Sequence, residues 1–237
     1  MSLRVVINQS NYLPWKGYFD LIHDADLFIF LDDVQFTKND WRNRNRVKAS
    51  QGCEWVTIPV GQNIRRLVCE VEMPSGDWAR QHWGTIERSY RLAPYFEKYA
   101  PFFMEVFLRM RWKYLSELNQ YIVRAIGKNF FGLKTKFLDS RDFQIQTRGQ
   151  DRVIDLLKQV GARTYISGPA GKTYLEPERF AAEGLSLQWK DYSGYPEYPQ
   201  LHPPFEHAVS ILDLLFSMGP EAADYIWGWR NNPPSSA

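Results

Sequence analysis

The sequence has few cysteines and no long apolar run. Of its 237 residues only Cys53 and Cys69 are cysteines, and their spacing forms neither a CxxC pair nor a disulfide framework. No run of about eighteen apolar residues is available to span a membrane. The opening residues, MSLRVVINQSNYL, lack the apolar core of a signal peptide. These absences predict a cytoplasmic protein with no membrane contact and no metal site.

The chain also lacks an excess of charge of either sign. It has 29 basic and 27 acidic residues, a net charge of +2, so no global field attracts nucleic acid, which we do not expect as a partner. Aromatic residues are abundant instead, at 16% with nine tryptophans. Most should build the core, but aromatic faces also stack on flat ligands such as sugars and bases.

The pattern of apolar segments predicts an α/β fold. A short apolar strand at Val5–Asn8 leads into a helix opened by Pro14, and a second strand, DLFIFLDD, follows. Strand, helix and strand within thirty residues are typical of parallel pairing. The same alternation returns near the C-terminus in TKFLDS, RTYIS and LSLQWKDY. We therefore predict a mostly parallel, Rossmann-like sheet with helices on both faces.

The middle of the chain has a different period. EWVTIPV and RRLVCEVEM are predicted as a third and fourth strand, and residues 77–130 as helices divided at Pro94 and Pro101. The last of these helices would run for nearly thirty residues, to Phe130. The predicted organisation is an N-terminal half of the core (1–76), a helical insertion (77–132), a C-terminal half with closing helices (133–229) and a disordered tail (230–237).

Polar residues follow three of the predicted strands. Asn8, Gln9 and Asn11 follow the first strand, Asp32 and Asp33 the second, and Gly168–Lys172 a later one. Because ligands of doubly wound sheets bind at the carboxyl ends of the strands, we expect these segments to surround one cleft. An aspartate there could act as a general base or hold a sugar hydroxyl, whereas the alternative is helix capping or a surface ion pair. Neighbouring side chains diverge, so at most one aspartate should face the cleft.

The segment SGPAGKTYL is the predicted phosphate site. Its glycines allow close backbone approach, the next helix would expose free N–H groups, and lysine adds a positive charge. The spacing is not that of a Walker A loop, and an ordinary strand-to-helix turn is the alternative. The residues assigned to phosphate are Ser167, Gly168, Gly171 and Lys172.

The segment KNDWRNRNRVK alternates arginine with asparagine. In an extended segment Arg44 and Arg46 would lie on one face and Asn43 and Asn45 on the other, suited to phosphate or carboxylate and to polar substrate groups. A solvated edge strand is the alternative.

His82 is a candidate acid or base because an unperturbed histidine titrates near neutrality, although a structural helix histidine is more common. No GxSxG sequence surrounds Ser10 or Ser167, and Cys53 lies in a glycine turn, so covalent catalysis is not expected.

These segments resemble the WbqC-like family of bacterial proteins. The resemblance rests, in order, on NYLPWKGYFDLI, FLDDVQFTKNDWRNRNRVK, SYRLAPYF, YISGPAGKTYL and SILDLLFSMG. Genes for family members typically accompany those for O-antigen, lipopolysaccharide or capsule, and the family is associated with unusual amino sugars. The resemblance therefore implies a role in the biosynthesis of surface-polysaccharide precursors.

One departure from the family pattern concerns the first loop. The usual opening reads like HQPNYLPW, whereas this chain has Asn8 and Ser10 in place of histidine and proline. Asparagine can replace the hydrogen bonds of histidine but not its proton transfer. The layout is also distantly similar to that of HIGH-type nucleotidyltransferases such as pantothenate synthetase, although both histidines of their motif are missing here.

The leading hypothesis is a transferase that modifies a nucleotide-linked amino sugar, by acyl or aminoacyl transfer to the sugar amine. Trp15 and Tyr18 would wall the sugar pocket. No resident cofactor is predicted, and the donor is left open between a nucleotide and an acyl or aminoacyl compound. A homodimer is left open. The alternatives are a nucleotidyl- or adenylate-forming transferase and a non-catalytic binding subunit of a glycan-biosynthesis complex.

Overall fold

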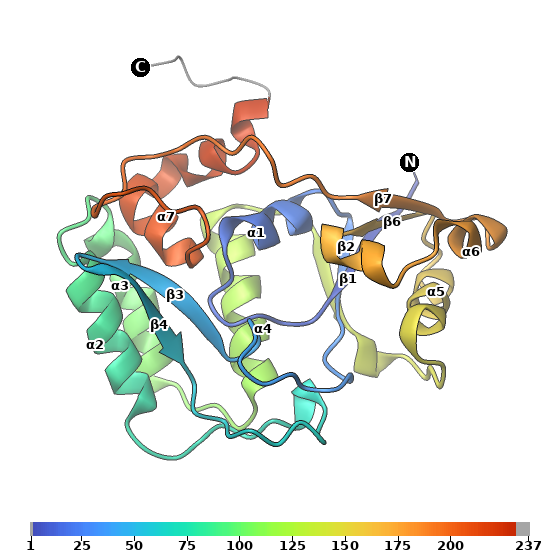
Figure 1. Cartoon of the computed structure of the whole chain (residues 1–237), viewed down its shortest axis with the longest axis horizontal. Coiled ribbons are helices and arrows are strands. Elements are labelled where there is room, and N and C mark those ends of the chain that lie inside the picture. The colour runs from blue at the N-terminus through green and yellow to red at the C-terminus, as the bar shows by residue number, and fades with distance from the viewer. Residues whose placement is uncertain (1, 231–237) are drawn as a thin grey trace.

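A computed structural model describes residues 2–230, and a five-stranded sheet forms its centre (Figure 1). All neighbouring strands pair in parallel, in the order β5-β2-β1-β6-β7. The strands are β1 (Arg4–Asn8), β2 (Leu27–Phe30), β5 (Lys136–Asp139), β6 (Thr164–Ser167) and β7 (Ser186–Trp189). The central strands are continuous apolar runs because both faces of a parallel sheet are buried. The predicted α/β class is confirmed.

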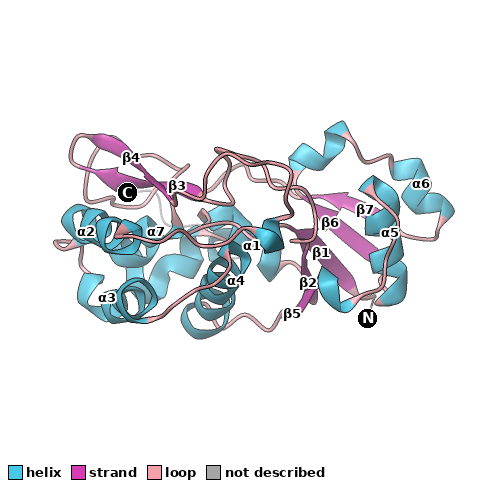
Figure 2. Cartoon of the chain, turned by 90° about the horizontal axis from the view of Figure 1, so that it is seen from below, coloured by secondary structure: helices cyan, strands magenta, loops and turns pink. Residues whose placement is uncertain are grey.

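Helices cover both faces of this sheet (Figure 2). Successive side chains of a strand point to opposite faces, so Val6 and Phe28 join one core and Val5 and Leu27 the other. On the first face lie α1 (Lys16–His23) and α4 (Leu115–Ala125), and on the second α5 (Gly149–Gln159) and α6 (Pro177–Ala182). Because helices cover both faces, the loops that connect strands and helices come together at the ends of the strands.

Beside the sheet lie a helical region and a small hairpin (Figures 1 and 2). The helices are α2 (Trp78–Tyr90), α3 (Phe96–Met104) and α7 (Ile211–Met218), and the antiparallel hairpin is β3 (Arg44–Ala49) and β4 (Gly52–Thr57). The Tyr90 hydroxyl accepts a hydrogen bond from the Lys48 backbone N–H at 2.7 Å, which ties α2 to the hairpin. The predicted strand in EWVTIPV thus belongs to this hairpin and not to the parallel sheet.

The predicted fourth strand in RRLVCEVEM is wrong. Val68–Glu70 form a 3₁₀ turn, and the flanking residues make only single β-bridges, Gln35 with Leu67 and Glu72 with Tyr114. The backbone N–H groups of Val68 and Cys69 instead bind the carbonyls of Val34 and Asp32. The segment therefore runs alongside residues 32–34, which follow β2, and is bound to them through the backbone.

The predicted helix from Pro101 to Phe130 is interrupted. Pro101 lies inside α3, which continues as a π-turn (Glu105–Arg109), and the chain is non-helical from 110 to 114. The Glu117 carboxylate accepts the N–H groups of Lys113 and Tyr114 at 3.1 and 3.0 Å and so starts α4. A capping interaction, with no proline or glycine, divides the helix.

Short turns complete the described chain, at Ser140–Asp142, Pro169–Thr173, Gly219–Tyr225 and Gly228–Arg230, with a further π-turn at Ile126–Phe130. Of the predicted tail, Arg230 belongs to the last of these turns, and 231–237 lie outside the described residues. No helix between residues 2 and 230 has the length and apolar character needed to cross a membrane.

Candidate functional site

The strand order places a topological switch point between β1 and β6. The chain leaves β1 towards β2 on one side, whereas it leaves β6 towards β7 on the other. Continuing the pairing of Arg4 with Thr164 brings Asn8 level with Gly168. Ligands of doubly wound sheets bind in the crevice at such a point. The structure thus brings two of the three predicted polar segments to neighbouring positions at the carboxyl edge.

The loop after β1 is held in place by hydrogen bonds from α1 and from the hairpin. The Tyr18 hydroxyl donates to the Gln9 carbonyl at 2.9 Å. The Asn45 side-chain amide donates to the carbonyls of Tyr12 and Leu13 at 3.2 and 2.8 Å. Leu13 has a φ of 44°, a left-handed conformation that costs energy for leucine and depends on such support. Tyr18 and Asn45, both predicted to bind substrate, therefore shape the loop.

Asp32 lies fully buried beneath this loop. One carboxylate oxygen accepts the Ser10 backbone N–H at 2.8 Å, and the other accepts the Gln120 side-chain amide at 2.9 Å. The same amide donates to Asp139 at 2.7 Å. Burial raises the pKa of Asp32, and the hydrogen bonds from Gln120 and Ser10 only partly oppose this effect. The geometry gives Asp32 a positioning role, and its predicted part in catalysis stays a prediction.

Asp33 points away from Asp32, in line with the divergence expected from the sequence. Its carboxylate accepts the Ser140 hydroxyl at 2.6 Å and forms an ion pair with Arg152. It therefore faces a different part of the surface from the loop after β1, and a catalytic role for Asp33 stays a prediction.

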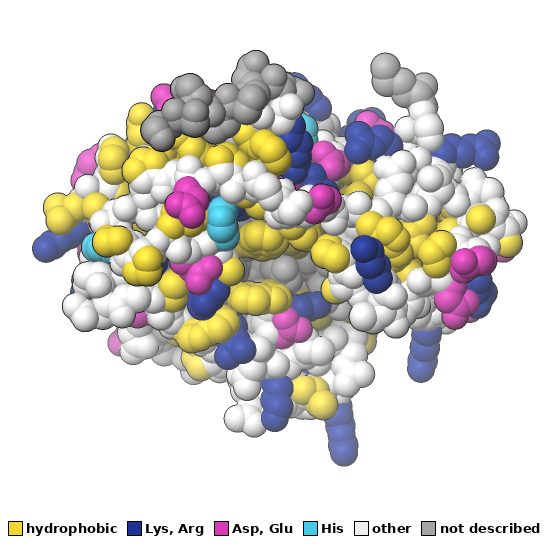
Figure 3. Space-filling model, turned by 45° about the horizontal axis from the view of Figure 1, so that its top comes forward, with side chains coloured by type: hydrophobic (Ala, Val, Ile, Leu, Met, Phe, Trp, Pro, Cys, Tyr) yellow, Lys and Arg dark blue, Asp and Glu magenta, His cyan; other side chains and the backbone are white. Residues whose placement is uncertain are grey.

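A cleft lies between the loop after β1 and the hairpin. We call it the aromatic cleft; its volume is 280 Å³ and its lining residues are Asn11, Pro14, Trp15, Trp41, Asn45 and Ala208. Three of these, Asn11, Trp15 and Asn45, are residues that the sequence predicts to bind substrate. The Trp41 side chain is 43% exposed and packs beside Trp55 with ring centroids 5.8 Å apart. Figure 3 shows hydrophobic side chains around a hollow in the middle of one face.

Several buried polar atoms near these segments have no partner within residues 2–230. They are Asn11 Oδ1, Arg42 Nε, Asn43 Oδ1 and Asn119 Oδ1. Buried polar atoms are almost always satisfied, by protein, water or ligand. Their gathering around the loops at residues 11 and 42 indicates that water or a ligand completes this region.

The position of the Trp15 ring depends on Gly17. A Cβ atom at Gly17 would lie 2.2 Å from Cζ2 of Trp15, so only glycine lets the indole lie against the first turn of α1. Tyr192 and Tyr195 contact the same indole edge-on, with centroids at 5.1 and 6.1 Å. The sequence Pro-Trp-Lys-Gly therefore fixes one wall of the aromatic cleft.

The predicted phosphate loop forms the 3₁₀ turn Pro169–Thr173. A Cβ atom at Gly171 would lie 2.4 Å from Ser167 Oγ and 2.9 Å from the Trp189 ring, so internal packing accounts for this glycine. Lys172 is exposed, with its ammonium 5.9 Å from the centroid of Trp189. Phosphate binding by Ser167, Gly168, Gly171 and Lys172 stays a prediction.

The arginine–asparagine segment has the predicted two faces. Asn43 and Asn45 are buried, and the Asn43 amide donates to the Ile58 carbonyl at 3.0 Å. Arg44 stacks on Trp55 with its guanidinium 4.1 Å from the ring centroid. Arg46 donates to the Ala208 carbonyl, at 3.1 Å from Nε and 2.6 Å from Nη2. Arg46 thus holds one wall of the aromatic cleft.

His82 lies buried between α2 and the hairpin. Its Nδ1 accepts the Tyr12 hydroxyl at 2.8 Å, and its Nε2 donates to the Thr57 carbonyl at 3.1 Å. Burial lowers the pKa of His82 to about 4, although the hydrogen bond to Thr57 opposes the shift. The neutral ring connects three segments and does not line the aromatic cleft, so its acid–base role stays a prediction without geometric support.

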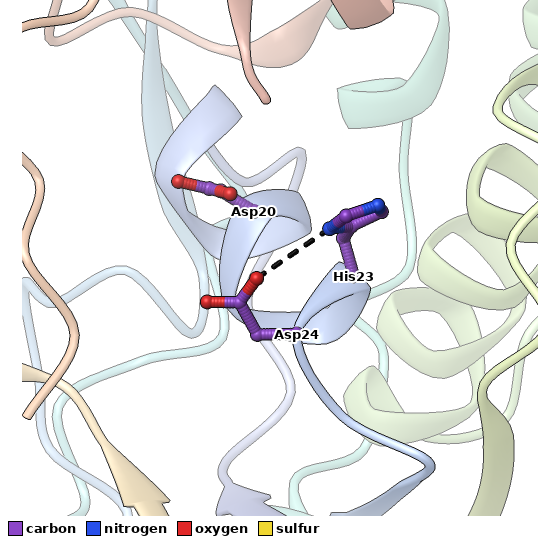
Figure 4. Close-up of side chains that lie close together, drawn as sticks. All are labelled: Asp20, His23 and Asp24. Atoms are coloured by element: carbon purple, nitrogen blue, oxygen red, sulfur yellow. Dashed lines mark hydrogen bonds and ion pairs between the residues drawn. The ribbon is translucent and has the colours of Figure 1, made fainter. Parts of the chain in front are cut away.

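Within residues 2–230 one group of side chains has the spacing of metal ligands, namely Asp20, His23 and Asp24 (Figure 4). Cations of the protein already occupy its carboxylates. Lys190 lies 2.9 Å from Asp20 and 2.6 Å from Asp24. Arg230 pairs with Asp20 at 2.5 Å. These charges offset the acids, so the group suits a salt-bridge network better than a metal ion.

Removal of divalent metals is therefore expected to leave stability unchanged. The melting temperature of purified protein should agree, within error, before and after dialysis against EDTA. Addition of Zn²⁺, Mn²⁺ or Mg²⁺ to the dialysed sample should not raise it. A metal-dependent rise that disappears in Asp24→Ala would show instead that the group binds an ion.

Some residues that shape the site carry weak sequence signals. Asn119 donates to the Arg42 carbonyl at 2.8 Å, and Gln120 joins Asp32 to Asp139. In the sequence both are polar positions of an amphipathic helix and suggest solvent. Trp41 carries the clearer signal, since tryptophan is rare in a run of Lys, Asn, Asp and Arg.

Fold and site together define an α/β protein with a parallel, doubly wound sheet and a cleft beside its carboxyl edge. The model of the WbqC-like protein family matches residues 9–225. The chain belongs to the WbqC-like protein family. It is 42% identical over 225 residues to the uncharacterised protein Rv1507c of Mycobacterium tuberculosis (strain H37Rv), covering 94% of this chain and 97% of that protein. No solved structure matches the chain.

Proposed function

We propose that the protein is a transferase that modifies a nucleotide-linked amino sugar for a bacterial surface polysaccharide, by acyl or aminoacyl transfer to the sugar amine. The family resemblance supplies the pathway and the class of substrate. The aromatic cleft, beside the carboxyl edge of the sheet, is the proposed binding place of the sugar.

The observation that carries this proposal is that two indole rings and an asparagine with an unpartnered side-chain oxygen line the same cleft. Trp15 and Trp41 line the cleft, and their faces can stack on the apolar faces of a sugar ring. Asn11 lines it too, and its buried Oδ1 has no hydrogen-bond partner within the described residues, so this oxygen still requires a donor from water or a ligand. The volume of 280 Å³ is close to the lower end of the range for small-molecule sites, about 300–1,000 Å³.

The charges near the cleft support an anionic group on the ligand. Arg42 pairs with Asp40 at 2.8 Å but keeps its buried Nε unpartnered within residues 2–230. Arg42 therefore offers positive charge to a diphosphate. In this proposal Asp32 positions the backbone of Ser10 under the substrate.

The test is a panel of nucleotide-sugars in a thermal-shift and calorimetric titration. Trp15→Ala and Trp41→Ala are each expected to weaken binding about tenfold, since each removes one stacking surface. Lys172→Ala should also weaken binding if the predicted phosphate loop contacts the diphosphate. Leu92→Ala, at a residue that is 76% exposed, is the control and should bind as the wild type does.

Unchanged binding in both tryptophan variants would remove the aromatic cleft from the proposal. Unchanged binding in Lys172→Ala alone would remove only the loop. Release of pyrophosphate from ATP or CTP, with a sugar or acid as co-substrate, would favour a nucleotidyl- or adenylate-forming transferase instead.

A further inference from the structure

A second and larger cleft lies beyond the ends of β2 and β5, with a volume of 810 Å³. We call it the basic cleft. Segments 33–35, 64–67 and 145–149, together with Arg152, line it. Four of the lining residues are arginines and one is acidic, namely Arg65, Arg66, Arg148, Arg152 and Asp33. The whole chain is nearly balanced, with 29 basic against 27 acidic residues, so the excess of positive charge in this concave site is local.

Arg152 is fixed in the wall of the basic cleft. Its Nη1 donates to the Ile145 carbonyl at 2.8 Å, and its Nη2 pairs with Asp33. The Ser140 hydroxyl donates to the same carboxylate at 2.6 Å and holds it in place. The Nε of Arg152 is buried and has no partner within residues 2–230.

Arg66 is fixed as well. Its Nε donates to the Asn63 carbonyl at 3.1 Å, its Nη2 donates to the Val60 carbonyl, and its guanidinium lies 5.4 Å from the centroid of Phe36. Neither carbonyl neutralises its charge. The cleft thus has two anchored guanidiniums, and only one of them is paired with a carboxylate.

Arg65 and Arg148 are different, because both are exposed and their side chains make no ion pair or hydrogen bond with any other described residue. Helix α5 begins next to Arg148, and no side chain caps its first turn. The free N–H groups of that turn add a partial positive charge to the one that the arginines already provide.

We propose that the basic cleft is a binding site for a phosphate-bearing small molecule. Guanidinium groups present paired N–H donors that match phosphate oxygens, and anchored arginines lose little conformational freedom on binding. The volume is large enough for a nucleotide or a sugar phosphate. Concave shape and near-neutral charge elsewhere favour a small molecule over nucleic acid, which needs an extended basic surface.

This site is independent of the proposed sugar site. The basic and aromatic clefts share no lining residue, and the adjacent aspartates at the end of β2 separate them, since Asp33 lines the basic cleft and Asp32 binds Ser10. The basic cleft also differs from the predicted phosphate loop at Gly168–Lys172, which does not line it.

Inorganic pyrophosphate is the probe, titrated calorimetrically into the full chain at low ionic strength and pH 7.5. The double variant Arg65→Gln with Arg148→Gln is expected to bind at least about tenfold more weakly than the wild type, because two charge-assisted contacts are lost. Both side chains are exposed, so the fold should persist, as circular dichroism would verify. Arg91→Gln, an exposed arginine at the end of α2, is the matched control and should bind as the wild type does.

Four results would overturn this assignment. The first three are absence of pyrophosphate binding to the wild type, equal affinity of the double variant, and stronger binding of a single-stranded oligonucleotide through the same two arginines. Trp15→Ala should retain pyrophosphate binding. Its loss there would place the anion in the aromatic cleft and overturn the assignment too, so the two proposed sites can fail separately.

Discussion

Replacing Asp20 by alanine is expected to lower the free energy of unfolding by about 3–5 kcal/mol. Asp20 is fully buried in α1, and its carboxylate accepts the Tyr195 hydroxyl at 2.5 Å and both terminal nitrogens of Arg230. Lys190, with a side chain only 5% exposed, lies 2.9 Å away. Without the carboxylate, Lys190 keeps only its contact with Asp24 and remains buried. The decrease in the free energy of unfolding is measured by chemical denaturation, with circular dichroism as the signal.

Asp142→Ala is the matched control for this experiment, because Asp142 is exposed and binds no other side chain within the described residues; it should change stability by less than about 0.5 kcal/mol. Asp20→Asn should fall between the two, since an amide keeps some hydrogen bonds but no charge. A loss for Asp20→Ala as small as that for Asp142→Ala would mean that the network adds little to stability.

Gly17→Ala is expected to weaken nucleotide-sugar binding by about tenfold, as much as Trp15→Ala does. The added methyl group would lie 2.2–2.7 Å from three ring carbons of Trp15, so the indole must leave the wall of the aromatic cleft. The near-ultraviolet circular dichroism of the tryptophans should change even without a ligand. Binding by calorimetry and the near-ultraviolet spectrum are the two measurements.

Gly84→Ala provides the control for a glycine in a helix. Gly84 lies in α2, and a Cβ atom there would meet nothing within 4 Å, so alanine should leave binding unchanged and stabilise the helix by up to about 1 kcal/mol. An unaltered spectrum in Gly17→Ala would show that the indole has room to adjust, and the steric argument would then be wrong.

The sequence predicts the parallel sheet well, for a physical reason. Residues 5–7 and Leu27–Phe30 are buried, so their apolar character is continuous. RRLVCEVEM misleads because Val68 and Val71 are buried like strand residues, yet no neighbouring strand pairs with the segment beyond single bridges. The break before α4 is equally hidden, since the carboxylate of Glu117 creates it.

The candidate site is predictable only in part. Asn11, Trp15 and Asn45 line one cleft, because the Asn45 amide binds the carbonyls of Tyr12 and Leu13 and holds the hairpin against the loop after β1. Solvent access cannot be deduced from the sequence, and Asp32 turns out to be covered by the loop above it. The basic cleft combines three segments, 33–35, 64–67 and 145–149, each an ordinary loop when considered alone.

The polar pair on α4 links the helical region to the sheet edge. Asn119 binds the carbonyl of Arg42, and Gln120 binds the two acids at the ends of β2 and β5, although neither residue lines the aromatic cleft. A mutation that tilts or shifts α4 would therefore move the residues around a bound ligand, although the mutated residue does not contact the ligand. Substitutions at α4 positions that do not line the aromatic cleft can therefore alter substrate preference, and mutagenesis limited to the lining residues would miss them.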